Sequence, residues 1–264
     1  MSTTRAPAVA GLFYPEDSVE LESAVAGYLA AVPAPPSNAP APKALIAPHA
    51  GYVYSGPVAA SGYARITGQR HVIRRVVLLG PSHRIPLRGL AVSSADAFDT
   101  PLGAIPLDRE AIDIILDFPQ VLTFDAAHRN EHSLEVQLPF LQYVLDDFSL
   151  VPFSVGDVEP NEVAEVIEKL WGGPETLFVV SSDLSHYNDY ETARQLDAAT
   201  TRAIEALDTH ALEPESACGC APARGLLAAA KRHGLSVETV DLRNSGDTAG
   251  DKQRVVGYGS YVFA

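Results

Sequence analysis

The stretch RRVVLLGPSH, residues 74–83, decides the fold class of this chain. Its apolar residues follow one another without polar alternation, which is typical of a strand covered on both faces. FSLVPFSV at 148–155 and TLFVVSS at 176–182 have the same character. We expect all three stretches to be buried strands of one sheet.

Helical patterns separate these strands. Apolar residues three and four positions apart predict helices at 108–118, 131–148, 159–171, 190–207 and 223–233. Pro139 should kink or divide the second of them. Further strands are expected at 235–242 and at 254–263. Residue types alternate along 254–263, which is typical of a strand that closes a sheet and has one wetter, more solvent-exposed face. This order predicts an α/β fold with a central, largely parallel or mixed sheet and helices on both faces.

Composition limits the organisation and the partners. The chain has 264 residues, 47% of them hydrophobic, and we expect a single domain over residues 1–264. A proline-rich stretch at 32–42 should be a surface loop between an N-terminal helix and the first core strand. The formal net charge of −14 argues against a nucleic-acid backbone or an anionic membrane as a partner. We therefore expect a small molecule or a cation as the ligand.

Two features predict a cytoplasmic protein. The only cysteines, Cys218 and Cys220, are too close in sequence for an ordinary loop-closing disulfide, which indicates a reducing compartment. In addition, the N-terminal stretch has no apolar core of signal-peptide length, and no stretch of the sequence has the length of a membrane span.

Three histidines follow the ends of apolar strands. His49 comes two residues after ALIA, His83 three after VVLLG, and His186 four after FVVSS. In such sheets ligands bind outside the carboxyl ends of the strands. Taken alone, any one of these histidines is explained equally simply as a loop residue whose ring bonds a backbone carbonyl. Three at equivalent places favour a shared site for a divalent ion, because neutral imidazole is the commonest metal ligand.

Two further residues, His132 and Asp183, are candidates, each with an alternative. His132 begins an expected helix beside Glu131, where it either caps the helix or supports the site and transfers a proton. Asp183, in the loop of His186, either caps a turn or orients an imidazole.

The region after residue 210 offers weaker signals. Cys218 and Cys220 precede an expected helix, whose dipole would favour the thiolate, although either could be an inert buried thiol. Asp247 and Asp251 either face the site or belong to a turn-rich loop. The remaining histidines are expected on the surface: His71, His128, His210 and His233.

Several stretches together resemble the Memo family, whose bacterial members are named AmmeMemoRadiSam system protein B. In chain order they are RAPAVAGLFYP (5–15), APHAGYVYSG (47–56), LGPSH (79–83), EHSLEVQLPF (131–140), SSDLSHY (181–187) and CGCAP (218–222). The resemblance implies the fold of class III extradiol ring-cleavage dioxygenases, the LigB type, which bind non-haem iron(II).

The resemblance also implies roles for single residues. His49 and His83 match the family's two metal histidines, and Cys218 matches the cysteine of the Memo site. His186 matches the active-site histidine and is expected as a further ligand or as the proton-transfer group. His132 corresponds to another pocket histidine and is the second candidate for the proton. Glu131 and Asp183 are expected to support these side chains.

One departure from the dioxygenases affects the expected chemistry. They complete their iron site with a glutamate, whereas here Cys218 stands in that place, and a thiolate shifts preference toward copper(I), zinc or a redox-active iron. We expect one divalent ion, iron(II) first and copper or zinc as alternatives, in a non-haem redox enzyme. The rivals are a non-enzymatic metal- or partner-binding protein and a zinc hydrolase. The family's bacterial name implies radical SAM-associated partner proteins and leaves the small-molecule substrate open.

Overall fold

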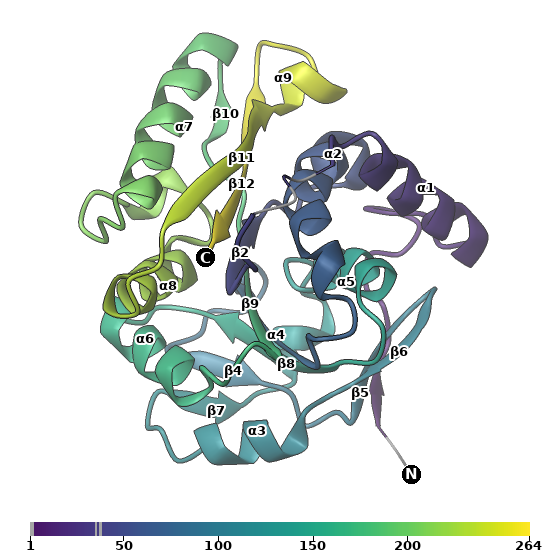
Figure 1. The fold of residues 1–264 in the computed structure, drawn as a ribbon, viewed down its shortest axis with the longest axis vertical. Coiled ribbons are helices and arrows are strands. Elements are labelled where there is room, and N and C mark those ends of the chain that lie inside the picture. Colours follow the sequence, from purple (N-terminus) through teal and green to yellow (C-terminus); the bar gives the residue numbers. More distant parts are fainter. Residues whose placement is uncertain (1–2, 35, 37–38) are drawn as a thin grey trace.

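A nine-stranded mixed sheet forms the centre of the molecule (Figure 1). The structure, a computed structural model, describes residues 3–34, 36 and 39–264. The strands in chain order are β1 Thr4–Arg5, β2 Ala44–Ala47, β3 Arg75–Pro81, β4 Leu90–Val92, β5 Ala97–Thr100, β6 Gly103–Pro106, β7 Val121–Thr123, β8 Ser149–Val155, β9 Thr176–Ser181, β10 His186–Asn188, β11 Val237–Asn244 and β12 Val255–Phe263.

Four adjacent strands, β2, β9, β3 and β8, run parallel and form the core of this sheet. Their side chains are almost all buried, as the unbroken apolar runs predict. β12 and β4 join antiparallel on either side, and β10, β11 and β7 complete the sheet. β1, β5 and β6 form a separate small sheet. The predicted mixed α/β architecture is confirmed.

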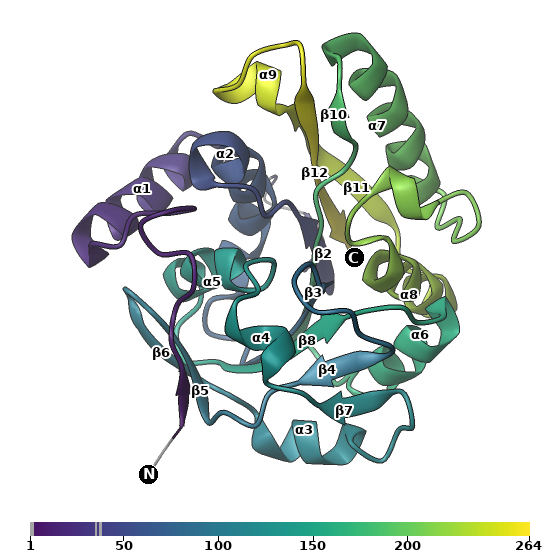
Figure 2. The ribbon, with the colours of Figure 1, turned by 180° about the vertical axis from the view of Figure 1, so that it is seen from behind.

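Helices cover both faces of the large sheet. They are α1 Ser18–Ala30, α2 Tyr52–Tyr63, α3 Arg109–Ile115, α4 Ala126–Arg129, α5 Leu138–Val144, α6 Pro160–Lys169, α7 Tyr190–Glu205, α8 Cys220–Arg232 and α9 Ser245–Thr248, with 3-10 turns η1 Ala64–Gln69, η2 Glu135–Gln137 and η3 Pro214–Ser216. Figures 1 and 2 show α1, α2 and α5 on one side of the sheet and α6, α7 and α8 on the other. None of the described helices is long and apolar enough to cross a membrane.

The segment predicted as one helix over 131–148 is divided, as Pro139 suggested. The turn η2 comes first, and α5 then begins at Leu138 with Pro139 in its first turn. Proline is tolerated there because the first helical N–H groups have no intrahelical acceptor. His132 therefore lies in the loop before the helical part and does not begin a helix.

The structure differs from two expectations about exposure, and a third expectation falls partly outside the described residues. The wetter face predicted for β12 is wrong: β12 lies between β2 and β11, with α2 and α7 packed against it, so eight of its nine residues are buried. His128 is also wrong as a surface residue, because it is 1% exposed and its Nε2 donates to the carbonyl of Ala91. Within the predicted loop 32–42, residues 35, 37 and 38 lie outside the described residues, and the others form neither helix nor strand.

Candidate metal centre

A pocket of about 840 Å³ lies at the carboxyl ends of β2, β3 and β9. His49 follows β2 by two residues, His83 follows β3 by two, and Asp183 follows β9 by two. The carboxyl ends of parallel strands meet at one edge of a sheet, so three loops bring these residues together. The pocket is lined by Phe13, His49, Ala50, Gly51, Tyr54, His83, Arg84, His132, Asp183, His186, Tyr187, Cys218, Ser245, Ala249, Gly250, Asp251, Arg254, Val256 and Tyr258.

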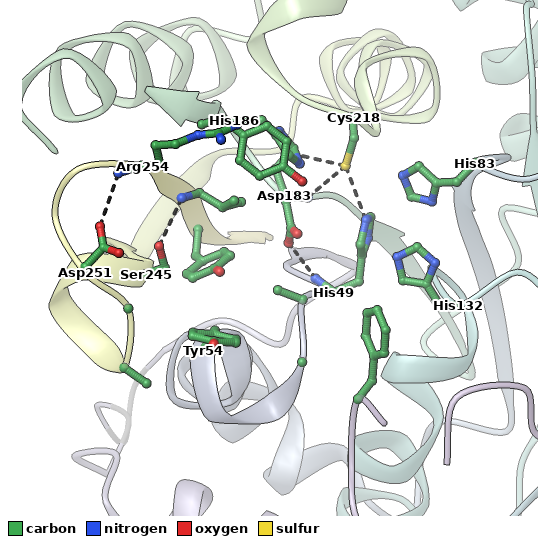
Figure 3. Close-up of a pocket in the computed structure, with 18 of the residues that line it drawn as sticks. His49, Tyr54, His83, His132, Asp183, His186, Cys218, Ser245, Asp251 and Arg254 are labelled. Atoms are coloured by element: carbon green, nitrogen blue, oxygen red, sulfur yellow. Dashed lines mark hydrogen bonds between the residues drawn. The ribbon is translucent and has the colours of Figure 1, made fainter. Parts of the chain in front are cut away.

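Three histidines of this pocket form a cluster. One ring nitrogen from each of His49, His83 and His132 lies within 4.8 Å of the other two. The ring of His132 stacks on that of His83, with the centroids 4.7 Å apart, and His49 meets both edge-on. Figure 3 shows the three rings side by side with the Cys218 sulfur above them. These three side chains could together hold a metal ion.

Hydrogen bonds determine which nitrogen of His49 carries the proton. Its Nδ1 lies 2.8 Å from Ser181 Oγ. The Ser181 hydroxyl gives its only proton to the carbonyl of Ser133, at 2.6 Å, and accepts from Gln137 Nε2 at 2.8 Å. Ser181 must therefore accept from Nδ1–H of His49, which leaves Nε2 as the unprotonated ring nitrogen. Nε2 faces Cys218 Sγ at 3.3 Å.

Ser181 and Gln137 had not been singled out from the sequence. Gln137 is oriented in turn, because its Nε2 donates to the carbonyl of Pro48 at 2.9 Å and its Oε1 accepts from the hydroxyl of Tyr63 at 2.8 Å. Both side chains are completely buried. Their signal in the sequence was a polar residue at the end of an apolar strand and another inside an apolar helical pattern.

Glu131 holds His83 in the cluster. Its carboxylate accepts from Nδ1 of His83 at 3.0 Å and from the His83 backbone N–H at 2.6 Å. It also accepts from the backbone N–H groups of His132 and Ser133. Burial alone would raise the pKa of Glu131, but these hydrogen bonds and the nearby His83 hold that pKa at about 2. The carboxylate is thus charged. Because it binds Nδ1 of His83, the other ring nitrogen, Nε2, points away from Glu131.

His132 has an unpaired ring nitrogen. Its Nδ1 is buried and lies 3.3 Å from Glu131 Oε1, but it is poorly aligned for a hydrogen bond and has no other partner among the described residues. Burial lowers the pKa of His132 to about 4 and that of His49 well below its usual value, so both rings are neutral at pH 7. Since its ring packs on His83, His132 belongs to the cluster and does not act as a helix cap.

Asp183 and Cys218 form one wall of the site. Asp183 Oδ1 accepts from the backbone N–H of His49 at 2.7 Å, so it fixes the main chain and not the imidazole ring. Burial raises the pKa of Asp183 to about 7. The sulfur of Cys218 accepts from the backbone N–H of Asp183 at 3.3 Å. Burial, with the charge of Asp183, raises the pKa of Cys218 to about 12, so the expected lowering by a helix dipole is wrong for the metal-free protein.

The other predicted residues lie at the margin of the site or away from it. His186 lines the pocket from β10 and is not part of the three-histidine cluster. Cys220 is the first residue of α8, buried, and its sulfur donates to the carbonyl of Leu212. Asp251 lines the pocket, whereas Asp247 accepts from the hydroxyl of Tyr190 outside it.

Comparison with known proteins identifies the family. A family model described as Memo-like protein matches residues 5–262. A MEMO1 family protein of Aquifex aeolicus is 40% identical, with 98% of both chains covered, and one of Thermotoga neapolitana is 37% identical, covering 98% of this chain and 99% of that one. A crystal structure of the uncharacterized protein JW3007 from Escherichia coli K12 has a TM-score of 0.48 and 14% identity, covering 81% of this chain and 98% of that one. The chain belongs to the Memo-like protein family.

Proposed function

We propose that the chain holds one divalent metal ion at His49, His83 and His132 and uses it in a redox reaction on a small molecule. The observation that carries the proposal is the approach of three ring nitrogens to within 4.8 Å of one another. His49 and His132 are neutral at pH 7, and neutral imidazole is the commonest metal ligand in proteins, so one shared ion fits this cluster.

The groups behind the histidines support a metal at their centre. Ser181 and Glu131 occupy the Nδ1 atoms of His49 and His83, which is how metal-binding imidazoles are usually oriented. The unpaired Nδ1 of His132 lies close to Glu131, and a small rotation of the ring on binding would complete the same arrangement. All three Nε2 atoms are then available as ligands.

Cys218 is the fourth donor of the proposed site. Its sulfur already lies 3.3 Å from His49 Nε2. Three imidazoles and one thiol suit iron(II), copper or zinc, and not the hard ions magnesium or calcium, which prefer oxygen. An iron(II) ion here would supply one-electron chemistry with dioxygen. Cys218 must lose its proton to bind, so metal affinity should increase with pH.

His186 is the proposed proton-transfer group. It lines the same pocket from another strand and is not one of the three clustered histidines, so it can exchange a proton with a bound molecule while the other three hold the metal. The alternative ligand role predicted for it from the sequence stays a prediction, as do the radical SAM-associated partners.

The proposal is tested by elemental analysis of protein purified without oxygen. The wild type should hold roughly one ion per chain. His49→Ala, His83→Ala and His132→Ala should each lose most of it, whereas His210→Ala, at an exposed site, should keep it. Oxygen uptake by the iron-loaded protein tests the redox part. A protein that binds zinc firmly and takes up no oxygen when iron is loaded would contradict it.

A further inference from the structure

The pocket extends from the histidine cluster to a second group of residues at its other side (Figure 3). Arg254 lies there, just before β12 begins, and Tyr187 lies next to it on β10. The guanidinium carbon of Arg254 is 5.1 Å from the centre of the Tyr187 ring, within cation–π distance. Neither residue has a part in the proposed metal chemistry.

Arg254 faces the pocket without a carboxylate partner in the described part of the chain. Other arginines of the chain are paired, for example Arg194 with Glu191 and Arg243 with Asp241. Asp251 also lines the pocket, but it accepts from the backbone N–H groups after it. A chain with a net charge of −14 thus keeps an unneutralised guanidinium at one side of its pocket. Guanidinium groups pair with planar anions through two parallel hydrogen bonds.

Tyr187 has a backbone conformation that bulky residues avoid. Its φ is 62°, which glycine adopts without steric cost. The pairing of β10 with β12 shifts register between His186 and Asn188, so Tyr187 is the extra residue of a bulge. Bulges next to active sites re-aim side chains. Here the bulge puts the Tyr187 ring against Arg254 and 5.8 Å from the ring of His186.

We propose that Arg254 binds the anionic group of the substrate and that Tyr187 positions the guanidinium for it. The substrate is then a small molecule with a carboxylate or phosphate at one end and a flat apolar body. Phe13, Tyr54 and Tyr258 also line the pocket and supply aromatic walls for that body. This inference names the substrate class of the proposed metal site and rests on that proposal.

The test uses the full chain freed of metal with EDTA, so that a carboxylate cannot bind an ion. Saturation-transfer NMR compares 3-phenylpropanoate with its neutral amide. The wild type should bind the acid about tenfold more tightly. Arg254→Gln should abolish that preference. Arg194→Gln is the matched control, since it removes an arginine that stacks on Tyr190 outside the pocket and should keep the preference.

A second variant separates positioning from stability. Tyr187→Gly relieves the positive φ, so the melting temperature should stay the same or rise. The acid should nevertheless bind several-fold more weakly, because the guanidinium loses the ring that holds it. Tyr187→Phe should keep most of the preference. Unchanged acid binding in Tyr187→Gly would overturn the positioning role.

The outcomes distinguish this inference from the metal proposal. Equal binding of acid and amide by the wild type, or an unchanged preference in Arg254→Gln, would overturn it. So would a preference lost only in Arg84→Gln, which would move the anion to the opposite side of the pocket. Metal content is measured separately on protein from the same cells. If the protein holds metal but does not prefer the acid over the amide, only the substrate class is contradicted. If it prefers the acid but never binds metal, only the proposed function is contradicted.

Discussion

At the scale of single residues, the site depends on buried polar groups behind the histidines. Ser181 has one proton and two lone pairs, and all three are used, by Ser133, Gln137 and His49. The position of the proton on His49 follows from this saturation and needs no assumption about a metal. The ring is therefore prepared to bind through Nε2 before an ion arrives.

Replacing Ser181 tests that preparation. Ser181→Ala leaves Nδ1 of His49 and one N–H of Gln137 without acceptors, so metal affinity should fall about 10- to 100-fold. The free energy of unfolding should fall by about 1–3 kcal/mol. Ser154→Ala is the control, because Ser154 is equally buried and its hydroxyl has no partner among the described residues. Metal titration that finds the two variants equal would contradict the role given to Ser181.

His128 should make stability depend on pH. Burial lowers its pKa to about 4, below the ordinary value of about 6.5 that the unfolded chain has. Between these values the unfolded chain binds more protons, so stability is lost as the pH falls, by up to about 1.4 kcal/mol per pH unit. His128→Gln removes the titrating group and should flatten the slope. Urea unfolding of the metal-free wild type and of His128→Gln at pH 7, 6 and 5 measures the free energy of unfolding at each pH. The same dependence on pH in both proteins would contradict the role of His128.

At the scale of elements, the strands were predictable and the contacts between loops were not. Long apolar runs in the sequence predict the buried strands β3, β8 and β9. The strands β4 to β7 are only three or four residues long, which is too short for such a pattern. Helix α2 was not predicted, because Pro57 and two glycines interrupt its pattern. His49 and His83 were placed correctly by the strands that they follow. That His132, and not His186, completes the cluster depends on how separate loops meet in space, which spacing in the sequence does not contain.

The loop of Cys218 depends on a close approach to β9. A methyl group on Gly219 would lie 2.7 Å from the carbonyl oxygen of Ser181 and 2.6 Å from Cβ of Ser182. Gly219→Ala should therefore push the loop away, destabilise the fold by about 1–3 kcal/mol and weaken metal binding. Gly27→Ala, in α1 with open space around it, should stabilise by about 0.5–1 kcal/mol. If the Gly219→Ala variant and the wild type had equal melting temperatures, the close approach of Gly219 to β9 would not be needed for stability.

At the scale of the whole molecule, the candidate site residues lie together at one edge of the sheet. The family match extends over the strands that carry them. The family model covers residues 5–262, so it includes every strand that carries a site residue. The single-domain organisation stays a prediction. The acidic chain also places two arginines, Arg84 and Arg254, at the pocket, beside Asp183 and Asp251.

Metal binding should stabilise the folded molecule as a whole. An ion present at about 100 times its dissociation constant adds about 2.7 kcal/mol, because it binds the folded chain and not the unfolded one. Thermal unfolding under nitrogen should show this as a higher melting temperature with iron(II) or zinc. His132→Ala should lose the increase, whereas His210→Ala should keep it. An increase of the same size in both variants would mean that the ion binds elsewhere.

The most direct test of the central claim is an anomalous difference map at the iron edge from crystals of the chain loaded with iron(II) without oxygen. The account predicts one strong peak about 2.0–2.2 Å from a ring nitrogen of each of His49, His83 and His132. Cys218 Sγ should lie about 2.3 Å from it. A peak bound to His186 with His132 turned away, or no peak in this pocket, would contradict the proposed metal centre.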